Sequence, residues 1–93
     1  MIEEGIETYK TDWVVYIIRC SDDSYYTGIS NNIEARVKKH NAGKGAKYTR
    51  SRRPVELIWS EPARNRSEAS KRECEIKKMK RIDKIALISV SSV

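Results

Sequence analysis

Three side chains on two predicted helices have the types and spacing that nucleophile activation and metal binding require. Arg36 and His40 are four residues apart, which places both on one face of a helix. Glu73 comes four residues after Ala69 and three before Ile76, so it falls on or beside the apolar stripe of a second helix. Burial of a carboxylate at such a position is unfavourable in free energy unless a cation or a metal ion accompanies it. These residues therefore offer a cation, a base and a metal ligand.

Cleavage of a phosphodiester bond is one reaction that needs this set. It requires an activated nucleophile, a cation near the phosphoryl oxygens and assistance to the leaving group. Tyr16 and Tyr26, on two predicted strands, are further candidates. A tyrosine has a pKa of about 10, so it is a poor base unless a metal or a cation lowers that pKa. The alternative for both tyrosines is ordinary packing in a strand.

The distribution of charge favours a polyanionic partner. The 93 residues carry a formal net charge of +6, and the segment 36–53 contains basic residues but no acid. A run of one sign favours nucleic acid, whereas solvated faces usually mix both signs. The alternative is a basic surface that only keeps the protein in solution. The candidates for nucleic-acid binding are Lys39, Lys44, Lys47, Tyr48, Arg50, Arg52 and Arg53.

Tyr48 has two interpretations that the sequence leaves open. It can stack on a base, as aromatic side chains do in single-strand binding, or pack on the sheet. The glycines of Gly43-Lys44-Gly45-Ala46-Lys47 superficially suggest a phosphate loop, but the spacing is not that of a P-loop and no strand directly precedes it. We interpret 44–53 as a basic loop that follows a helix ending at Gly43.

The hydrophobic pattern predicts an α/β (α+β) fold. A dense β-branched and aromatic run at 13–20 indicates a strand buried on both faces, and 25–29 completes an antiparallel hairpin. Asn31 and Glu34 form a plausible capping box for the first helix. The predicted strands cover 13–20, 25–29 and 54–59, and the predicted helices cover 31–43, 67–81 and 83–88. The order β-β-α-β-α-α implies a small, mostly antiparallel three-stranded sheet flanked by helices.

Length and composition predict a single domain over 12–93, preceded by an acidic, loosely ordered tail over 1–11. No run approaches the roughly 18 apolar residues of a membrane span, and the acidic start is not a targeting signal, so we expect a cytoplasmic protein without a membrane partner. Cys20 and Cys74 form no CxxC pair, and with one histidine they cannot make a zinc cluster. We expect two free, buried thiols.

The register of the hairpin decides whether Tyr16 and Tyr26 can serve one site. A four-residue turn at 21–24 pairs Cys20 with Tyr25, and the two tyrosines then face opposite sides of the sheet. A shared site needs a register shift of one residue, through a bulge or a loop of odd length. Gly28 suggests a bulge or a close backbone approach. We therefore predict an irregular hairpin.

At the level of motifs the chain resembles the GIY-YIG nuclease family, and the small single-domain bacterial members in particular. Val14-Val15-Tyr16 stands for the first tyrosine triplet, without its glycine, and Tyr26-Thr27-Gly28 stands for the second. The pair Arg36 and His40, the run 41–49 and the helix around Glu73 resemble the blocks that follow in the family. The resemblance covers roughly 13–88.

The resemblance implies a role for each of the five candidates. Tyr16 and Tyr26 would activate or order the attacking water near the scissile phosphate, and Arg36 would stabilise charge on the phosphoryl group. His40 would be a second polar catalytic contact, where other branches have a tyrosine. Glu73 would hold a single Mg²⁺ or Mn²⁺. Some branches have a lysine just after the second triplet, and this sequence offers none at 29–31.

Three functions follow from these patterns. The first is a metal-dependent endonuclease acting on nucleic acid, with DNA expected rather than RNA. The second is a nucleic-acid-binding module that keeps the nuclease fold with weak or no catalysis. The third is an interaction module, supported only by the acidic tail. A single domain of this size also leaves room for a protein partner that supplies substrate specificity.

Overall fold

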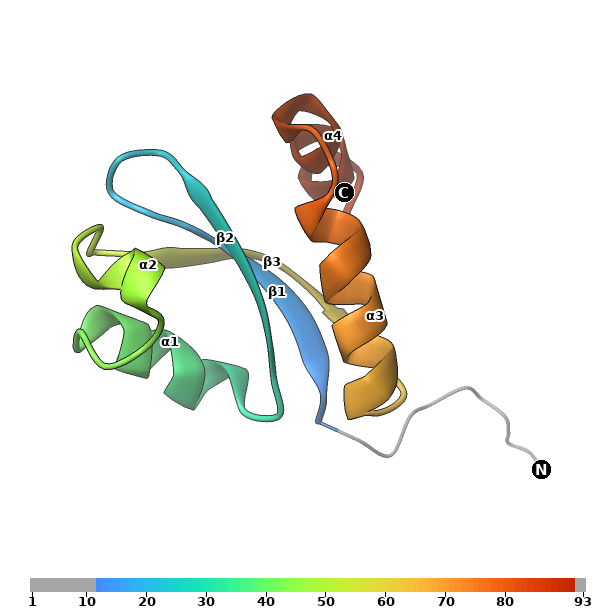
Figure 1. Cartoon of the computed structure of the whole chain (residues 1–93), viewed down its shortest axis with the longest axis horizontal. Helices are drawn as coiled ribbons and strands as arrows, with labels where there is room; N and C mark the ends of the chain where they lie inside the picture. The colour runs from blue at the N-terminus through green and yellow to red at the C-terminus, as the bar shows by residue number, and fades with distance from the viewer. Residues whose placement is uncertain (1–11, 92–93) are drawn as a thin grey trace.

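The computed structural model describes residues 12–91, and of Ser91 only the backbone. Its elements follow one another as β1 (Val14–Arg19), β2 (Tyr25–Ser30), α1 (Ile33–Asn41), α2 (Lys47–Arg50), β3 (Glu56–Pro62), α3 (Arg66–Lys77) and α4 (Arg81–Ser91). The strands form one antiparallel sheet in the order β2-β1-β3, which confirms the predicted fold class. In Figure 1, α1 and α2 lie on one side of this sheet and α3 and α4 on the other. No helix within 12–91 is both long and apolar enough to span a bilayer.

The two sides of the sheet bury separate apolar clusters. Val15 and Ile17 point towards α3, where they pack with Ala69 and Ile76. Tyr16 and Ile18 point the other way, and Val37 of α1 packs against that cluster. Because β1 is the central strand, it is buried on both faces, as its dense apolar sequence predicts. Tyr16 is the polar member of this buried strand.

The hairpin loop has an odd length, and this places Tyr16 and Tyr26 on the same face of the sheet. Arg19 pairs with Tyr25 and Tyr16 pairs with Gly28, so five residues, 20–24, connect the strands. The turn is held by Asp22, whose carboxylate accepts a hydrogen bond from the Ser24 amide (3.1 Å). The four-residue turn is therefore wrong, and so is the bulge in this hairpin, because the β1–β2 register is continuous. The irregularity lies between β1 and β3, after Ile17.

Gly28 makes the close approach that the sequence suggested. It lies directly opposite Tyr16, and a Cβ atom placed on it would come within 2.6 Å of the Tyr16 hydroxyl oxygen. Such a contact is shorter than a carbon and an oxygen tolerate, so a side chain at position 28 would displace the phenol. Gly28 thus leaves room for the Tyr16 ring beneath the edge strand.

Several predicted boundaries need correction. The α1 cap is Asn32 rather than Asn31, since the Asn32 side chain accepts from the Ala35 amide. The expected basic loop contains the short helix α2, and β3 begins two residues later than predicted and extends to Pro62. Helix α3 ends at Lys77, before the predicted end at 81. Helix α4 begins at Arg81 rather than after Asp83 and continues to Ser91, so Asp83 lies inside its first turn. Local sequence is least informative at such ends.

The cysteines follow their prediction in part. Both cysteines are free, and Cys20 is buried, but Cys74 is exposed on α3, so its predicted burial is wrong. Trp59 is buried and Trp13 packs against the same cluster, as expected of core residues. The predicted tail at 1–11 lies outside the described residues.

Candidate active site

The centre of the candidate site is a buried hydrogen bond between β1 and α1. The Tyr16 hydroxyl oxygen lies 2.9 Å from His40 Nε2. Both side chains are almost completely buried, with 2% and 1% of their surface exposed. The other ring nitrogen, Nδ1, lies 2.8 Å from the Thr49 hydroxyl oxygen in α2. One strand and two helices thus meet at a single imidazole.

The hydrogen-bond network assigns the protons of this chain. The Thr49 hydroxyl is 3.0 Å from the Ala46 carbonyl, which only accepts, so Thr49 donates there. Thr49 then accepts from His40 Nδ1–H, and Nε2 accepts from the Tyr16 hydroxyl. In the opposite tautomer Nδ1 would accept only the longer contact, 3.4 Å, from the Ala46 amide, and the Tyr16 hydroxyl proton would lose its acceptor Nε2. The site therefore holds a neutral imidazole that accepts from a phenol.

Burial keeps both members of the pair neutral. Burial raises the pKa of Tyr16 above its usual value, and the nearby Tyr26 phenol and the Glu73 carboxylate add to this, while Arg36 opposes it. Burial lowers the pKa of His40 below its usual 6.5, and the charge of Arg36 lowers it further. Tyr16 thus keeps its proton at neutral pH and His40 is free to accept one. An additional cation near the phenol would be needed to release the Tyr16 proton.

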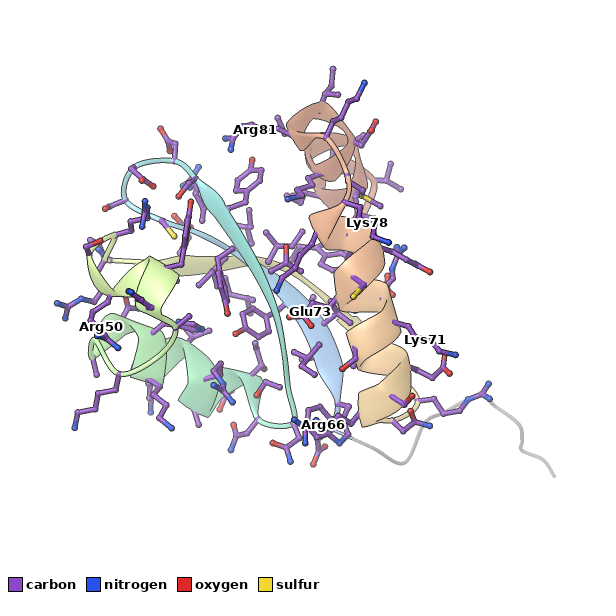
Figure 2. The ribbon with its side chains drawn as sticks, in the orientation of Figure 1. Arg50, Arg66, Lys71, Glu73, Lys78 and Arg81 are labelled. Carbon is purple, nitrogen blue, oxygen red and sulfur yellow. The ribbon has the colours of Figure 1, made fainter. Side chains whose placement is uncertain are left out.

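The other three candidate residues lie around this hydrogen bond. The Tyr26 ring lies edge-on to the His40 ring, with centroids 5.4 Å apart. Arg36 and Glu73 lie within electrostatic range of the Tyr16 phenol. Figure 2 shows Glu73 on the side of α3 that faces the sheet, whereas Lys71 points away from it. Residues separated by almost sixty positions in the sequence are thereby gathered at one place.

Glu73 has the environment that its helix position predicts, with an accompanying cation. Its side chain is 22% exposed, and its carboxylate lies 3.2 Å from the Lys77 ammonium group one turn later. The neighbours Ala69 and Ile76 are fully buried. The Lys77 ammonium also lies 5.9 Å from the centre of the Tyr26 ring. Lys77 thus contacts both Glu73 and Tyr26.

The donor set around Glu73 fits a hydrated hard cation better than a protein-caged metal. Within 12–91 there is no group of three His, Cys, Asp or Glu side chains that could enclose an ion. Mg²⁺ keeps several water ligands and often binds through one or two carboxylates and the phosphates of a substrate. A single carboxylate would suffice for such an ion if substrate phosphates and water supplied the other ligands, whereas a structural zinc site needs four protein ligands.

The candidate nucleic-acid contacts separate into two groups. Lys39, Lys44, Lys47 and Arg50 are exposed on α1, α2 and their connection, and Figure 2 shows Arg50 on the outer side of α2. Arg52 instead pairs with Asp22 (3.0 Å), and Arg53 donates to the Arg50 carbonyl (2.8 Å). These two arginines hold the α2 segment in place, so their charge is partly committed within the protein.

Tyr48 is in contact with the site rather than extended from it. Its ring stacks on Tyr26 with centroids 6.0 Å apart, and the Arg52 guanidinium lies 4.0 Å from its centre. The side chain is 39% exposed. Tyr48 thus packs on β2 of the sheet, and stacking of its exposed part on a base stays a prediction.

Three contributors to the site escaped the sequence patterns. Thr49 is fully buried and fixes the His40 ring, but nothing in its local sequence distinguishes it from any other threonine. Gly45 packs so closely on His40 that any side chain there would collide with the imidazole, which explains a glycine that superficially suggests phosphate binding. Lys77 lies in a run of mixed charge that is typical of a solvated face, and its position four residues after Glu73 is the sequence signal for the ion pair.

The buried histidine predicts a pH dependence of stability. The unfolded chain binds a proton at His40 as the pH falls through about 6.5, whereas the folded protein binds it only at a lower pH. The free energy of unfolding should therefore decrease as the pH falls below 6.5. Urea denaturation at pH 7.5 and 5.5 measures this, and His40→Gln should remove most of the difference. Because the chain has one histidine, its ring-proton NMR titration should show a midpoint below 6.5; a midpoint at or above 6.5 would refute the assignment.

Comparison with known families agrees with the geometry. The model of the GIY-YIG catalytic domain matches residues 12–85, which include every candidate catalytic residue and Glu73. The chain therefore belongs to the GIY-YIG family, and it has the nuclease-type fold of that family.

Several similar proteins are bacterial UPF0213 proteins. A UPF0213 protein of Desulfotalea psychrophila is 51% identical over 91% of this chain and 78% of its own length. One from Staphylococcus haemolyticus is 54% identical over 80% of this chain and 90% of its own. The solution structure of a UPF0213 protein from Bacillus halodurans has 42% identity and a TM-score of 0.55, covering 84% of this chain and 83% of that one. A protein structure from E. faecalis has 39% identity and a TM-score of 0.60, covering 94% and 92%.

Proposed function

We propose that this protein is a divalent-metal-dependent endonuclease that hydrolyses phosphodiester bonds in nucleic acid, with DNA as the expected substrate. The observation that carries the proposal is the buried chain Tyr16–His40–Thr49. A neutral imidazole that accepts from a phenol, with an arginine and a carboxylate in electrostatic reach, is an arrangement for moving a proton next to an anionic substrate.

The chain's own residues provide a route for that proton. As water attacks phosphorus, its proton passes to the Tyr16 oxygen while the phenol proton passes to His40 Nε2. The P–O bond to the leaving strand breaks in the same displacement, and the departing oxygen takes its proton from solvent. Thr49 accepts from Nδ1–H throughout, which keeps the ring oriented and stabilises the imidazolium that forms. Arg36, exposed on α1, supplies positive charge to the phosphoryl oxygens.

Glu73 would hold one Mg²⁺ or Mn²⁺, which when bound polarises a phosphoryl oxygen and favours ionisation of water. The exposed lysines at 39, 44 and 47 and Arg50 would bind the phosphate backbone next to this site. A partner protein that selects the substrate stays a prediction.

The direct test is cleavage of branched, flapped and single-stranded DNA by the purified protein with Mg²⁺ or Mn²⁺. We expect nicked or cut products that are abolished by EDTA and restored by excess metal ion. Absence of products on every substrate with either metal, or products that persist in EDTA, would overturn the proposal.

A second candidate function has its own supporting observation. The Lys77 ammonium group pairs with the Glu73 carboxylate, the group that would bind a metal. A carboxylate occupied by a lysine is expected of a binding module with weak catalysis. Such a module would bind nucleic acid with an affinity that falls steeply with salt, yet show no metal-dependent turnover. The cleavage assay, run beside a binding titration at two salt concentrations, distinguishes the two functions.

A further inference from the structure

Lys77 is the one charged side chain that contacts Glu73 in the described part of the chain. Its ammonium group lies 3.2 Å from a Glu73 carboxylate oxygen and near the face of Tyr26. It also lines a shallow groove of about 230 Å³ with Tyr25, Tyr26, Thr27, Tyr48 and Lys84. One cation therefore borders both the candidate metal ligand and an open groove.

We infer that Lys77 is an exchangeable counter-ion of Glu73, which moves to a phosphate of bound nucleic acid and so couples nucleic-acid binding to metal binding. The inference rests on the proposed function, because it takes Glu73 as the metal ligand. In the free protein Lys77 keeps the half-buried carboxylate paired and competes with the metal. When a phosphate draws the ammonium into the groove, the carboxylate becomes available.

The Glu73–Lys77 ion pair is weak enough for its partners to exchange. Lys77 is 52% exposed, and solvent weakens such a pair until it contributes little. Glu73 precedes Lys77 by four residues on a helix, so the pair forms and breaks by side-chain rotation without any movement of α3. A divalent ion or a phosphate can therefore replace either partner at low cost.

The groove offers the displaced ammonium a suitable second position. Lys77 and Lys84 both border it, so two positive charges face the same open space beside Tyr26. A phosphate in that space would attract the Lys77 ammonium group away from Glu73. It would also place its own negative charge near Glu73, which favours binding of a cation there. This also supplies a lysine near the second tyrosine triplet, from α3 rather than from the sequence after β2.

Thermodynamic linkage fixes the sign and symmetry of the effect. If nucleic acid releases Glu73 from Lys77, nucleic acid must raise the affinity for metal, and metal must raise the affinity for nucleic acid by the same factor. Given the usual strength of an exposed ion pair, we expect a factor of about two to five.

The experiment measures Mn²⁺ affinity by paramagnetic relaxation with and without a short DNA duplex, in a Tyr16→Phe background that preserves the DNA. We expect the duplex to increase Mn²⁺ affinity about two- to fivefold when Lys77 is present. Lys77→Gln should bind Mn²⁺ more tightly without DNA, and the increase caused by DNA should disappear. Lys77→Arg should restore both properties.

Lys84→Gln is the matched control, because it removes an equal charge from the same groove without touching Glu73. It should weaken DNA binding and leave the Mn²⁺ affinity of the free protein unchanged. Equal Mn²⁺ affinities for Lys77→Gln and its parent, with Mn²⁺ broadening the Glu73 resonances in both, would overturn this inference alone. If Mn²⁺ broadens no resonance near Glu73 in any variant, the metal site of the proposed function fails first.

Discussion

Glu73→Gln is expected to reduce metal-dependent cleavage by roughly 10²- to 10⁴-fold, because a metal ion supplies several kcal/mol of transition-state stabilisation. Glutamine keeps the size and a carbonyl oxygen but removes the charge that a divalent cation needs. The fold should persist, since among residues 12–91 the ion pair that Glu73 loses is the partly exposed one with Lys77. Surface pairs of this kind contribute about 0–1 kcal/mol. Cleavage rates under saturating Mg²⁺ and a urea denaturation curve give the two quantities.

Glu75→Gln is the matched control for this prediction. Glu75 lies two residues further along α3, is exposed and bonds Arg72 (3.1 Å), on a part of the helix remote from the tyrosines. Its replacement should change the cleavage rate by less than about twofold. The fold should persist as well, because surface substitutions usually change the free energy of unfolding by under about 0.5 kcal/mol. Full cleavage by Glu73→Gln, or an equal loss in both variants, would remove Glu73 from the metal site.

The hairpin illustrates how far the sequence alone could lead. The β-branched run around Tyr16 predicted a central strand correctly, because burial on both faces leaves a plain compositional pattern. Whether Tyr16 and Tyr26 share a face depended on one residue of loop length. Cys20 reads equally well as the last strand residue or as the first loop residue, so local propensity could not settle the register. In the structure Cys20 belongs to the loop, and both tyrosines therefore lie on one face of the sheet, beside His40.

The site was predictable where chemistry coincides with helical spacing. Arg36, His40 and Glu73 were selected because periodicity fixes which helical face a residue occupies. Thr49 could not be selected, because its role depends on how α2 folds back onto α1, a tertiary contact between segments that look like a basic loop. For the same reason Arg52 resembled a free phosphate ligand, although in the folded protein it pairs with Asp22.

Gly45 and Gly28 show a related limit of sequence interpretation. Each glycine stands where a catalytic candidate needs space, Gly45 against His40 and Gly28 against Tyr16. In sequence, a glycine beside lysines suggests phosphate binding, and a glycine in a strand suggests either a bulge or a close approach. In the structure both glycines are explained by the close packing of the Tyr16–His40 pair, which the sequence suggested as one alternative for Gly28 and not for Gly45. The positions of Tyr16 and His40 therefore depend on glycines that leave space for their rings.

Tyr16→Phe separates proton transfer from metal binding. The ring and its packing remain, but the hydroxyl that donates to His40 Nε2 at 2.9 Å is lost. We expect cleavage to fall by roughly 10²- to 10⁴-fold, the usual contribution of a positioned acid or base. Mn²⁺ affinity should stay unchanged, because Glu73 is untouched. The buried Nε2 loses its partner, so the free energy of unfolding should fall by about 1–3 kcal/mol.

Tyr25→Phe serves as the control, since Tyr25 lies on the same hairpin but packs with the cluster on the other face, where Arg81 covers its ring. It should cleave at the rate of the wild type. A folded Tyr16→Phe protein that retains full activity would show that the phenol only supports His40, and the water would then have to lose its proton to another group. Loss of activity together with loss of Mn²⁺ binding would indicate instead that Tyr16 holds the metal site in shape. Loss of activity with Mn²⁺ binding retained is the result that identifies Tyr16 as the residue that activates water.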